Sequence, residues 1–144
     1  MIQRIQTLYM LAISGFMTAL CFTPMVRYMA DGTDGAFVAF DFWWLGVLFA
    51  LAALVPFVTI WLFKNRMLQV RLLCAEVVLL VGSEAFALWA SLRVVKTVKA
   101  MGEVAVANMQ TATFFPLVCV ILTLLAIRGI LKDERLVRSL DRIR

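Results

Sequence analysis

Histidine is absent from the sequence, and the three cysteines form no CxxC pair. Histidine and paired cysteines supply most ligands of zinc, haem and iron–sulfur groups, so we expect no metal and no cofactor. Cys21, Cys74 and Cys119 all fall within apolar segments, where a thiol usually packs as a small hydrophobic group. Cys21 and Cys119 have similar expected depths, but the sequence does not predict a disulfide, because that needs closely spaced Cα atoms.

Charged residues are also scarce, at 16% of the chain, whereas apolar residues make up 64%. The mean hydropathy is +0.96, and soluble domains are only about 45–50% apolar. This composition predicts an integral membrane protein. The sequence also lacks a nucleophile motif and an acid pair set in an obvious pocket, so we expect no enzyme.

Four long apolar segments account for most of the 144 residues, which predicts a single membrane domain spanning residues 1–144. Each segment is long enough to cross a hydrocarbon core of about 30 Å. The first is too long for the apolar part of a signal peptide, about 7–15 residues, so we expect it to be retained as a helix. The predicted helices lie at about residues 5–26, 42–63, 72–92 (with an extension toward residue 100) and 114–131. The predicted fold class is all-α: a polytopic membrane protein with four transmembrane helices in an antiparallel bundle.

The distribution of Lys and Arg predicts the orientation of the bundle. Ten of the 14 basic residues flank the segments on the side of the two termini, and the other four lie on the opposite side. Cytoplasmic flanks carry the excess of basic residues in membrane proteins. Both termini are therefore predicted to be cytoplasmic. The four basic residues on the other side are Arg27, Arg93, Lys96 and Lys99, and the last three predict a solvated extension of the third helix.

The second apolar segment carries aromatic residues at both ends, with Trp43 and Trp44 at one and Trp61 at the other. Tryptophan is enriched at membrane interfaces, so this segment is a well-defined span. Pro56 inside it predicts a kink and a freed carbonyl group that a neighbouring helix must satisfy.

The two connections on the non-cytoplasmic side differ in character. Residues 27–41 contain two Asp-Gly pairs between short alternating stretches, which is typical of a turn and a small hairpin. Asp31, Asp34 and Asp41 do not match the ligand spacing of a calcium loop, so no metal site is predicted there. Residues 101–113 are expected to form a compact loop without chemistry.

Two glutamates, Glu76 and Glu84, interrupt the third apolar segment. A charged side chain at the bilayer centre costs roughly 2.5–3.5 kcal/mol, so such residues usually face the interior of a bundle. On a helical projection the glutamates share one arc with small and polar residues, and we expect this arc to face the other helices. The other members of the arc are Ser83, Ala87, Ala90 and Ser91.

Small residues one turn apart let two helices approach closely. Gly15 and Ala19 in the first segment and Gly46 and Ala50 in the second provide patches that match the small-residue arc of the third, which predicts a compact four-helix bundle.

The candidate intramembrane polar site consists of Glu76, Glu84 and Arg128. Glu76 and Arg128 fall at similar predicted depth near the cytoplasmic side, so we expect an ion pair between them. Glu84 lies near the predicted midplane without a basic partner. It is protonated, hydrogen-bonded to Ser or Thr, or part of a proton or ion path.

The tail, residues 132–144, is predicted to form a short amphipathic helix, with Glu134 and Arg138 spaced to pair. Its surplus of arginine favours an anionic leaflet, and docking onto a protein partner remains open. The candidate cytoplasmic interaction face consists of Arg4, Lys64, Arg66, Arg71, Lys132, Arg135, Arg138 and Arg142.

Three stretches of the chain resemble a known family: MIQRIQTLY (1–9), FKNRMLQVRL (63–72) and AIRGILKDERLVRSLDRIR (126–144). The family is an uncharacterised, domain-of-unknown-function group of small four-span integral membrane proteins from Bacteroidetes. The resemblance implies a four-helix protein of the bacterial inner membrane and carries no established activity.

Two classes of function follow from these observations. The leading expectation is a non-enzymatic accessory or scaffold subunit that presents its basic cytoplasmic face to a protein partner or to anionic lipid headgroups. The alternative is a small transporter or an ion- or proton-conducting subunit that uses Glu84. A homo-oligomer is compatible with the alternative, because the four helices of one chain alone leave little room for a pore. The basic residues report orientation first, and no nucleic-acid partner is expected.

Overall fold

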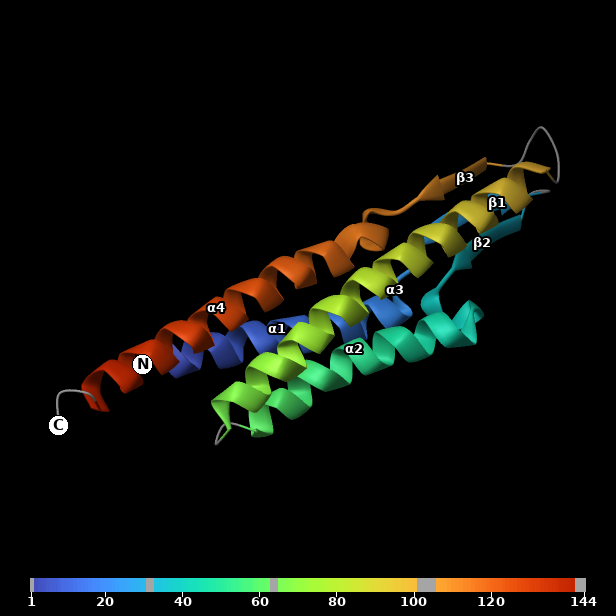
Figure 1. Cartoon of the computed structure of the whole chain (residues 1–144). Helices are drawn as coiled ribbons and strands as arrows, with labels where there is room; N and C mark the ends of the chain where they lie inside the picture. The colour runs from blue at the N-terminus through green and yellow to red at the C-terminus, as the bar shows by residue number, and fades with distance from the viewer. Residues whose placement is uncertain (1, 31–32, 63–64, 101–105, 142–144) are drawn as a thin grey trace.

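The protein is a bundle of four long helices with a small sheet at one end (Figure 1). The computed structural model describes residues 2–30, 33–62, 65–100 and 106–141. Helices α1 and α3 each pack against both α2 and α4, so the four helices form a ring. All four are long and apolar enough to cross a membrane, as the sequence predicts. Their bounds are Ile2–Phe22 (α1), Trp43–Trp61 (α2), Arg66–Ala100 (α3) and Phe115–Asp141 (α4).

The helix bounds differ from the sequence prediction in three places. Helix α1 ends at Phe22, because Pro24 and a strand follow it. Helix α3 begins at Arg66 and continues to Ala100, so the predicted extension is confirmed and the helix also starts earlier. Helix α4 runs without a break from the apolar segment to Asp141. The tail is therefore a continuation of α4 rather than a separate helix, because no Gly or Pro follows Leu131 to end it.

A three-stranded antiparallel sheet closes the end of the bundle opposite the two termini (Figure 1). Strands β1 (Val26–Ala30) and β2 (Thr33–Phe37) form the hairpin that the sequence predicts. Strand β3 (Val106–Met109) pairs with the other edge of β1, so the prediction of a plain loop over residues 101–113 was wrong. Two short 3-10 helices, Ala39–Asp41 (η1) and Thr111–Phe114 (η2), lead from the sheet into α2 and α4.

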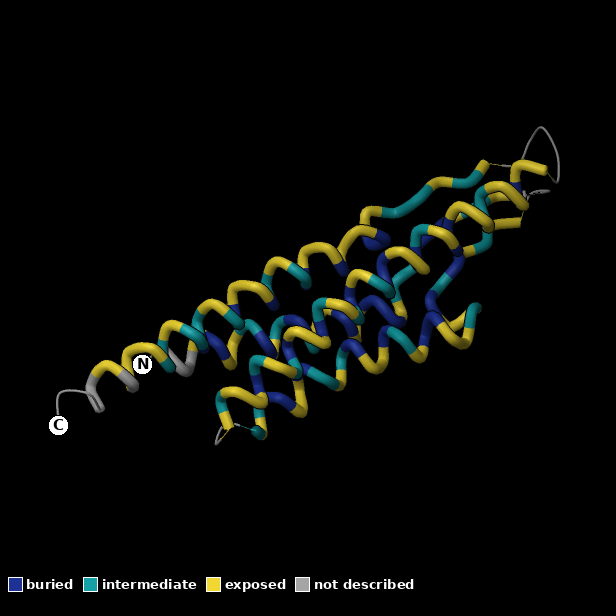
Figure 2. The backbone as a smooth tube through the Cα atoms, in the orientation of Figure 1, coloured by how far each residue is buried: buried dark blue, intermediate teal, exposed yellow. Residues whose placement is uncertain are grey.

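The surface of the bundle is apolar, and the buried residues lie along its axis (Figure 2). The larger core cluster contains Ile13, Met17, Phe49 and Leu80, and a smaller cluster lies nearer the termini around Leu73. Trp43 and Trp61 are 76% and 74% exposed at the two ends of α2, which is typical of aromatic anchors at two membrane interfaces.

Helix α2 continues through Pro56, and α1 supplies a hydrogen bond beside it. Proline at this position frees the carbonyl group of Ala52, and Ser14 Oγ donates to the next carbonyl oxygen, that of Ala53, at 2.8 Å. A neighbouring helix thus contributes a donor beside the proline, but to the carbonyl group of Ala53 rather than to the freed one.

Helices α1 and α2 pack against each other, but three of the four small residues expected to let helices approach closely do not lie at a helix contact. Gly15, Ala19 and Ala50 are exposed, and the fourth member of the two patches, Gly46, is buried against the ring of Phe40. A Cβ atom at Gly46 would lie 2.6 Å from Cδ1 of Phe40. This glycine therefore makes room for an aromatic ring rather than for another helix.

Candidate functional site

The inward face of α3 carries the polar residues that the helical projection predicts. Glu76, Ser83 and Ser91 are each 0% exposed, and Glu84 is 5% exposed. Ala87 and Ala90 are also buried. The predicted arc is therefore confirmed as the face that α3 turns toward the bundle.

The depths of the two glutamates differ from the prediction. The side chain of Gln69 donates from Nε2 to the carbonyl oxygen of Thr59 at 3.0 Å, which fixes the level of α3 against α2. At 1.5 Å per residue, Glu76 lies about 10 Å further along α3, level with the middle of α2. Glu84 lies about 22 Å along, level with Trp44 near the start of α2. Glu76 rather than Glu84 is therefore the carboxyl group at mid-depth, because α3 begins earlier than expected.

The predicted ion pair between Glu76 and Arg128 is not formed. Arg128 is exposed on α4, because Ala126 and Ile130 are the positions that α4 turns inward. Neither oxygen of Glu76 has a hydrogen-bond partner among the described residues, and the same holds for Glu84.

The hydroxyl group of Ser83, the nearest candidate donor in the sequence, donates to Leu80 O at 2.8 Å instead. A hydrogen bond from Ser83 to Glu84 is therefore not present. Within the part of the chain that the structure describes, both interior carboxyl groups therefore lack a hydrogen-bond donor.

The thiol groups are spread over two environments. Cys21 and Cys119 are buried, Cys74 is exposed, and all three are free thiols. The Cys21 thiol contacts the carbonyl oxygen of Met17 at 3.4 Å. Within the described residues, no thiol forms a hydrogen bond with Glu76 or Glu84.

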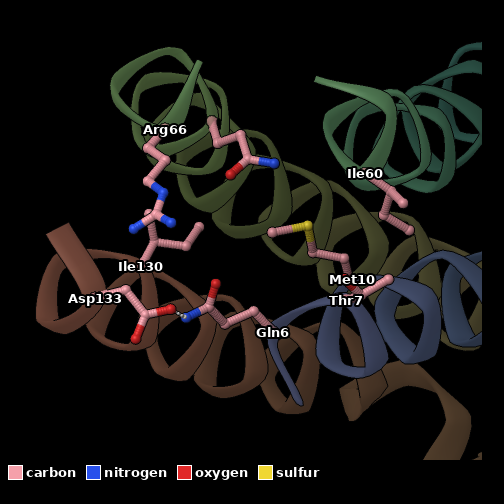
Figure 3. A pocket seen from close by; sticks show the side chains of 8 residues that line it. Gln6, Thr7, Met10, Ile60, Arg66, Ile130 and Asp133 are labelled. Atoms are coloured by element: carbon pink, nitrogen blue, oxygen red, sulfur yellow. Dashed lines mark hydrogen bonds between the residues drawn. The ribbon is translucent and has the colours of Figure 1, made fainter. Parts of the chain in front are cut away.

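A polar pocket lies at the end of the bundle where the termini are, and all four helices line it (Figure 3). Its volume is about 190 Å³. Gln6 of α1 donates from Nε2 to Oδ2 of Asp133 of α4 at 2.9 Å. Gly129 lies directly beside Gln6, where a Cβ atom would stand 3.0 Å from its Cγ. The lining residues are Gln6, Thr7, Met10, Ile60, Arg66, Gln69, Ile130 and Asp133.

Arg66 extends from the start of α3 over this pocket, opposite Asp133 and Gln6 (Figure 3). Its Nη1 atom is buried and has no hydrogen-bond partner in the described part of the chain. A buried guanidinium nitrogen without a partner costs free energy, so it marks a place where an acceptor group would bind favourably.

Further basic side chains lie on α3 and α4 toward the same end of the bundle. Arg71 on α3 and Lys132 and Arg135 on α4 are exposed. Four of the residues predicted for the cytoplasmic face therefore lie at one end of the bundle: Arg66, Arg71, Lys132 and Arg135. The side chains of Arg4, Lys64, Arg138 and Arg142 lie outside the described residues, so the predicted pair of Glu134 with Arg138 stays a prediction.

A model of the family Domain of unknown function (DUF4293) matches residues 2–143. The chain belongs to this family. Comparison with curated proteins and with solved structures finds no match. The match confirms the resemblance seen in the three stretches. Among the described residues of this DUF4293 chain, the polar pocket and the interior glutamates both hold buried polar atoms without a hydrogen-bond partner.

Four polar residues of the pocket were not predicted as site residues from the sequence: Gln6, Thr7, Gln69 and Asp133. A signal for Gln69 was present, because it precedes Glu76 by seven residues and so falls on the same face of the helix. Gln6 likewise shares one face with Met10, Ile13 and Met17, which are all buried. A polar residue on the inward face near a helix end is the pattern that predicts such a pocket.

Proposed function

We propose that this protein is a non-enzymatic accessory subunit of the bacterial inner membrane, with both termini in the cytoplasm. Its basic end would bind an acidic surface of a protein partner. The observation that carries the proposal is the clustering of exposed Arg71, Lys132 and Arg135 around one end of the bundle. The excess of basic residues on that side favours a cytoplasmic location, and such a surface favours an acidic partner through complementary charge.

Copurification from the native membrane tests this function. The tag is inserted between Ala100 and Val106, which leaves the basic end free. A stoichiometric partner is expected with the wild-type protein. It should be lost when Arg71, Lys132 and Arg135 are all replaced by Gln, because the cations that attract it are gone.

The matched control replaces Arg27, Lys96 and Lys99 by Gln, three exposed basic residues at the strand end. This variant should keep the partner. If the partner is retained by the first variant, or if wild-type protein purifies alone, the accessory function is rejected.

A second candidate function is transport of a proton or ion, and the burial of Glu76 favours it. A carboxyl group at mid-depth without a partner in the described structure is the kind of group that carries protons in membrane transporters. Flux in proteoliposomes should then be lost in Glu76→Gln and retained in Asp34→Asn, which removes a carboxylate exposed on β2. Equal flux in wild-type and Glu76→Gln protein would exclude this function.

A further inference from the structure

The polar pocket is lined by one basic and one acidic side chain. Arg66 reaches into it from α3, and Asp133 reaches into it from α4 (Figure 3). Asp133 accepts a hydrogen bond from Gln6, while Arg66 Nη1 has no hydrogen-bond partner within the described residues. The space of about 190 Å³ between these residues has room for several water molecules or a small polar group.

The pocket lies at the level of a membrane interface. Ile60 lines it, and the next residue, Trp61, is the exposed aromatic anchor at the end of α2. Tryptophan anchors lie at the level of lipid headgroups. The first backbone N–H groups of α3 also lie at this end, since α3 begins at Arg66, and a helix N-terminus favours an anion.

We propose that this pocket binds a phosphoethanolamine group, with the phosphate on Arg66 and the primary ammonium on Asp133. A guanidinium group binds a phosphate through charge-assisted hydrogen bonds, and a carboxylate accepts hydrogen bonds from an ammonium group. One zwitterion therefore satisfies both side chains at once.

Other headgroups satisfy only half of the pocket. The headgroup of phosphatidylglycerol offers a phosphate and hydroxyl donors but no cation, so it leaves the negative charge of Asp133 without a counter-charge from the ligand. The headgroup of phosphatidylcholine offers a cation without N–H donors, so it cannot donate a hydrogen bond to Asp133. The pair of Arg66 and Asp133 thus selects for a phosphate and a primary ammonium on the same ligand.

This inference deepens the proposed function, and it rests on that function only in placing this end of the bundle at a membrane surface. It does not depend on a protein partner. The phosphoethanolamine group has two sources, the headgroup of phosphatidylethanolamine and the water-soluble ester itself, and the experiment distinguishes them.

Lipid titration by native mass spectrometry tests the inference on delipidated full-length protein in detergent. We expect phosphatidylethanolamine to bind about tenfold more tightly than phosphatidylglycerol or phosphatidylcholine with the same acyl chains. Arg66→Gln should weaken binding of phosphatidylethanolamine by about tenfold. Excess soluble phosphoethanolamine displaces the lipid if the headgroup alone is recognised, and fails to displace it if the acyl chains are also needed.

The decisive variant is Asp133→Asn, because it changes selectivity rather than only affinity. Removing the carboxylate should abolish the preference for phosphatidylethanolamine over phosphatidylglycerol, while the binding of phosphatidylglycerol is kept or increased. A misfolded protein would lose both lipids, so this outcome separates a direct contact from loss of structure.

Matched controls replace an exposed arginine and an exposed aspartate at the strand end, Arg27→Gln and Asp34→Asn. Both should bind lipids as the wild-type protein does. The inference is overturned if the wild-type protein does not prefer phosphatidylethanolamine, or if Asp133→Asn keeps that preference.

The two proposals fail separately. The partner experiment changes Arg71, Lys132 and Arg135, none of which lines the pocket, and the lipid experiment changes Arg66 and Asp133, which do. Loss of the partner with unchanged lipid selectivity, and the reverse, are therefore distinct results.

Discussion

At the scale of single residues, the carboxyl group of Glu76 is in an energetically unfavourable environment. It is 0% exposed, and neither of its oxygens has a hydrogen-bond partner among the residues that the structure describes. An unsatisfied buried polar group costs about 1–3 kcal/mol, and an apolar group of the same shape avoids that cost. We therefore expect Glu76 to lower the stability of the bundle.

Replacing Glu76 by Met should stabilise the protein. Methionine fills a similar volume without a polar group, so we expect the free energy of unfolding to rise by about 1–3 kcal/mol. Equilibrium unfolding in mixed micelles measures this change. Val78→Met, at a position of α3 that is 73% exposed, is the control and should leave stability unchanged. Destabilisation by Glu76→Met alone would show that the carboxyl group makes a favourable interaction.

At the scale of elements, the sheet and η2 are joined through one carbonyl group. The carbonyl oxygen of Met25 accepts hydrogen bonds from Gln110 N at 2.8 Å and from Thr113 Oγ1 at 3.1 Å. Thr113 is 0% exposed. The segment that leads into α4 is thereby attached to the segment that follows α1, across 88 residues of chain.

Replacing Thr113 by Val removes one of these two hydrogen bonds and keeps the shape of the side chain. We expect a loss of about 1 kcal/mol in the free energy of unfolding. Thr111→Val serves as the control because Thr111 is exposed in the same short helix. Equal stability of the Thr113 and Thr111 variants would mean that Gln110 alone holds the junction.

How far the sequence could predict these elements depends on the range of the interactions. The inward arc of α3 follows from helical periodicity alone, and Glu76, Ser83 and Ser91 are buried as that periodicity requires. Strand β3 has only four residues and becomes a strand because β1 offers a free edge. A pairing partner so distant in the chain leaves no local pattern.

The candidate site shows the same limit. The gathering of basic residues at one end was predictable because short flanks of apolar segments report the side of the membrane. The pocket was not predictable, because its prediction requires the relative heights of Gln6, Arg66 and Asp133, which lie on three different helices. The relative heights of the helices were also needed to place Glu76. Its depth depends on where α3 begins, and the expected later start led to the wrong partner, Arg128.

At the scale of the whole molecule, the two ends of the bundle differ in kind. The end with the termini carries the polar pocket and the exposed basic residues, and the other end carries the sheet (Figure 1). Helix α3 has 35 residues and is therefore about 52 Å long, well beyond a hydrocarbon core of about 30 Å. Exposed Arg93, Lys96 and Lys99 lie on the part near the sheet, where a helix that leaves the bilayer meets water.

Labelling with a membrane-impermeant maleimide tests the proposed orientation. In intact spheroplasts Asn108→Cys, an exposed position on β3, should be labelled, whereas Ser139→Cys, exposed near the end of α4, should be labelled only after lysis. The wild-type protein is the control and should remain unlabelled in both cases, since Cys21 and Cys119 are buried and Cys74 lies on the apolar surface. The opposite pattern would place the termini outside.

The position of β1 in the middle of the sheet sets an order of events during synthesis. Its residue Val26 pairs with Met109, roughly 80 residues later, and at roughly 5–20 residues per second their synthesis is separated by about 4–16 s. A hairpin of two strands is only marginally stable by itself in water. Until β3 is synthesised, one edge of β1 in the nascent chain therefore has no pairing strand. Strand β3 is synthesised last and pairs with that edge of β1. This pairing connects the segment between α3 and α4 to the segment between α1 and α2.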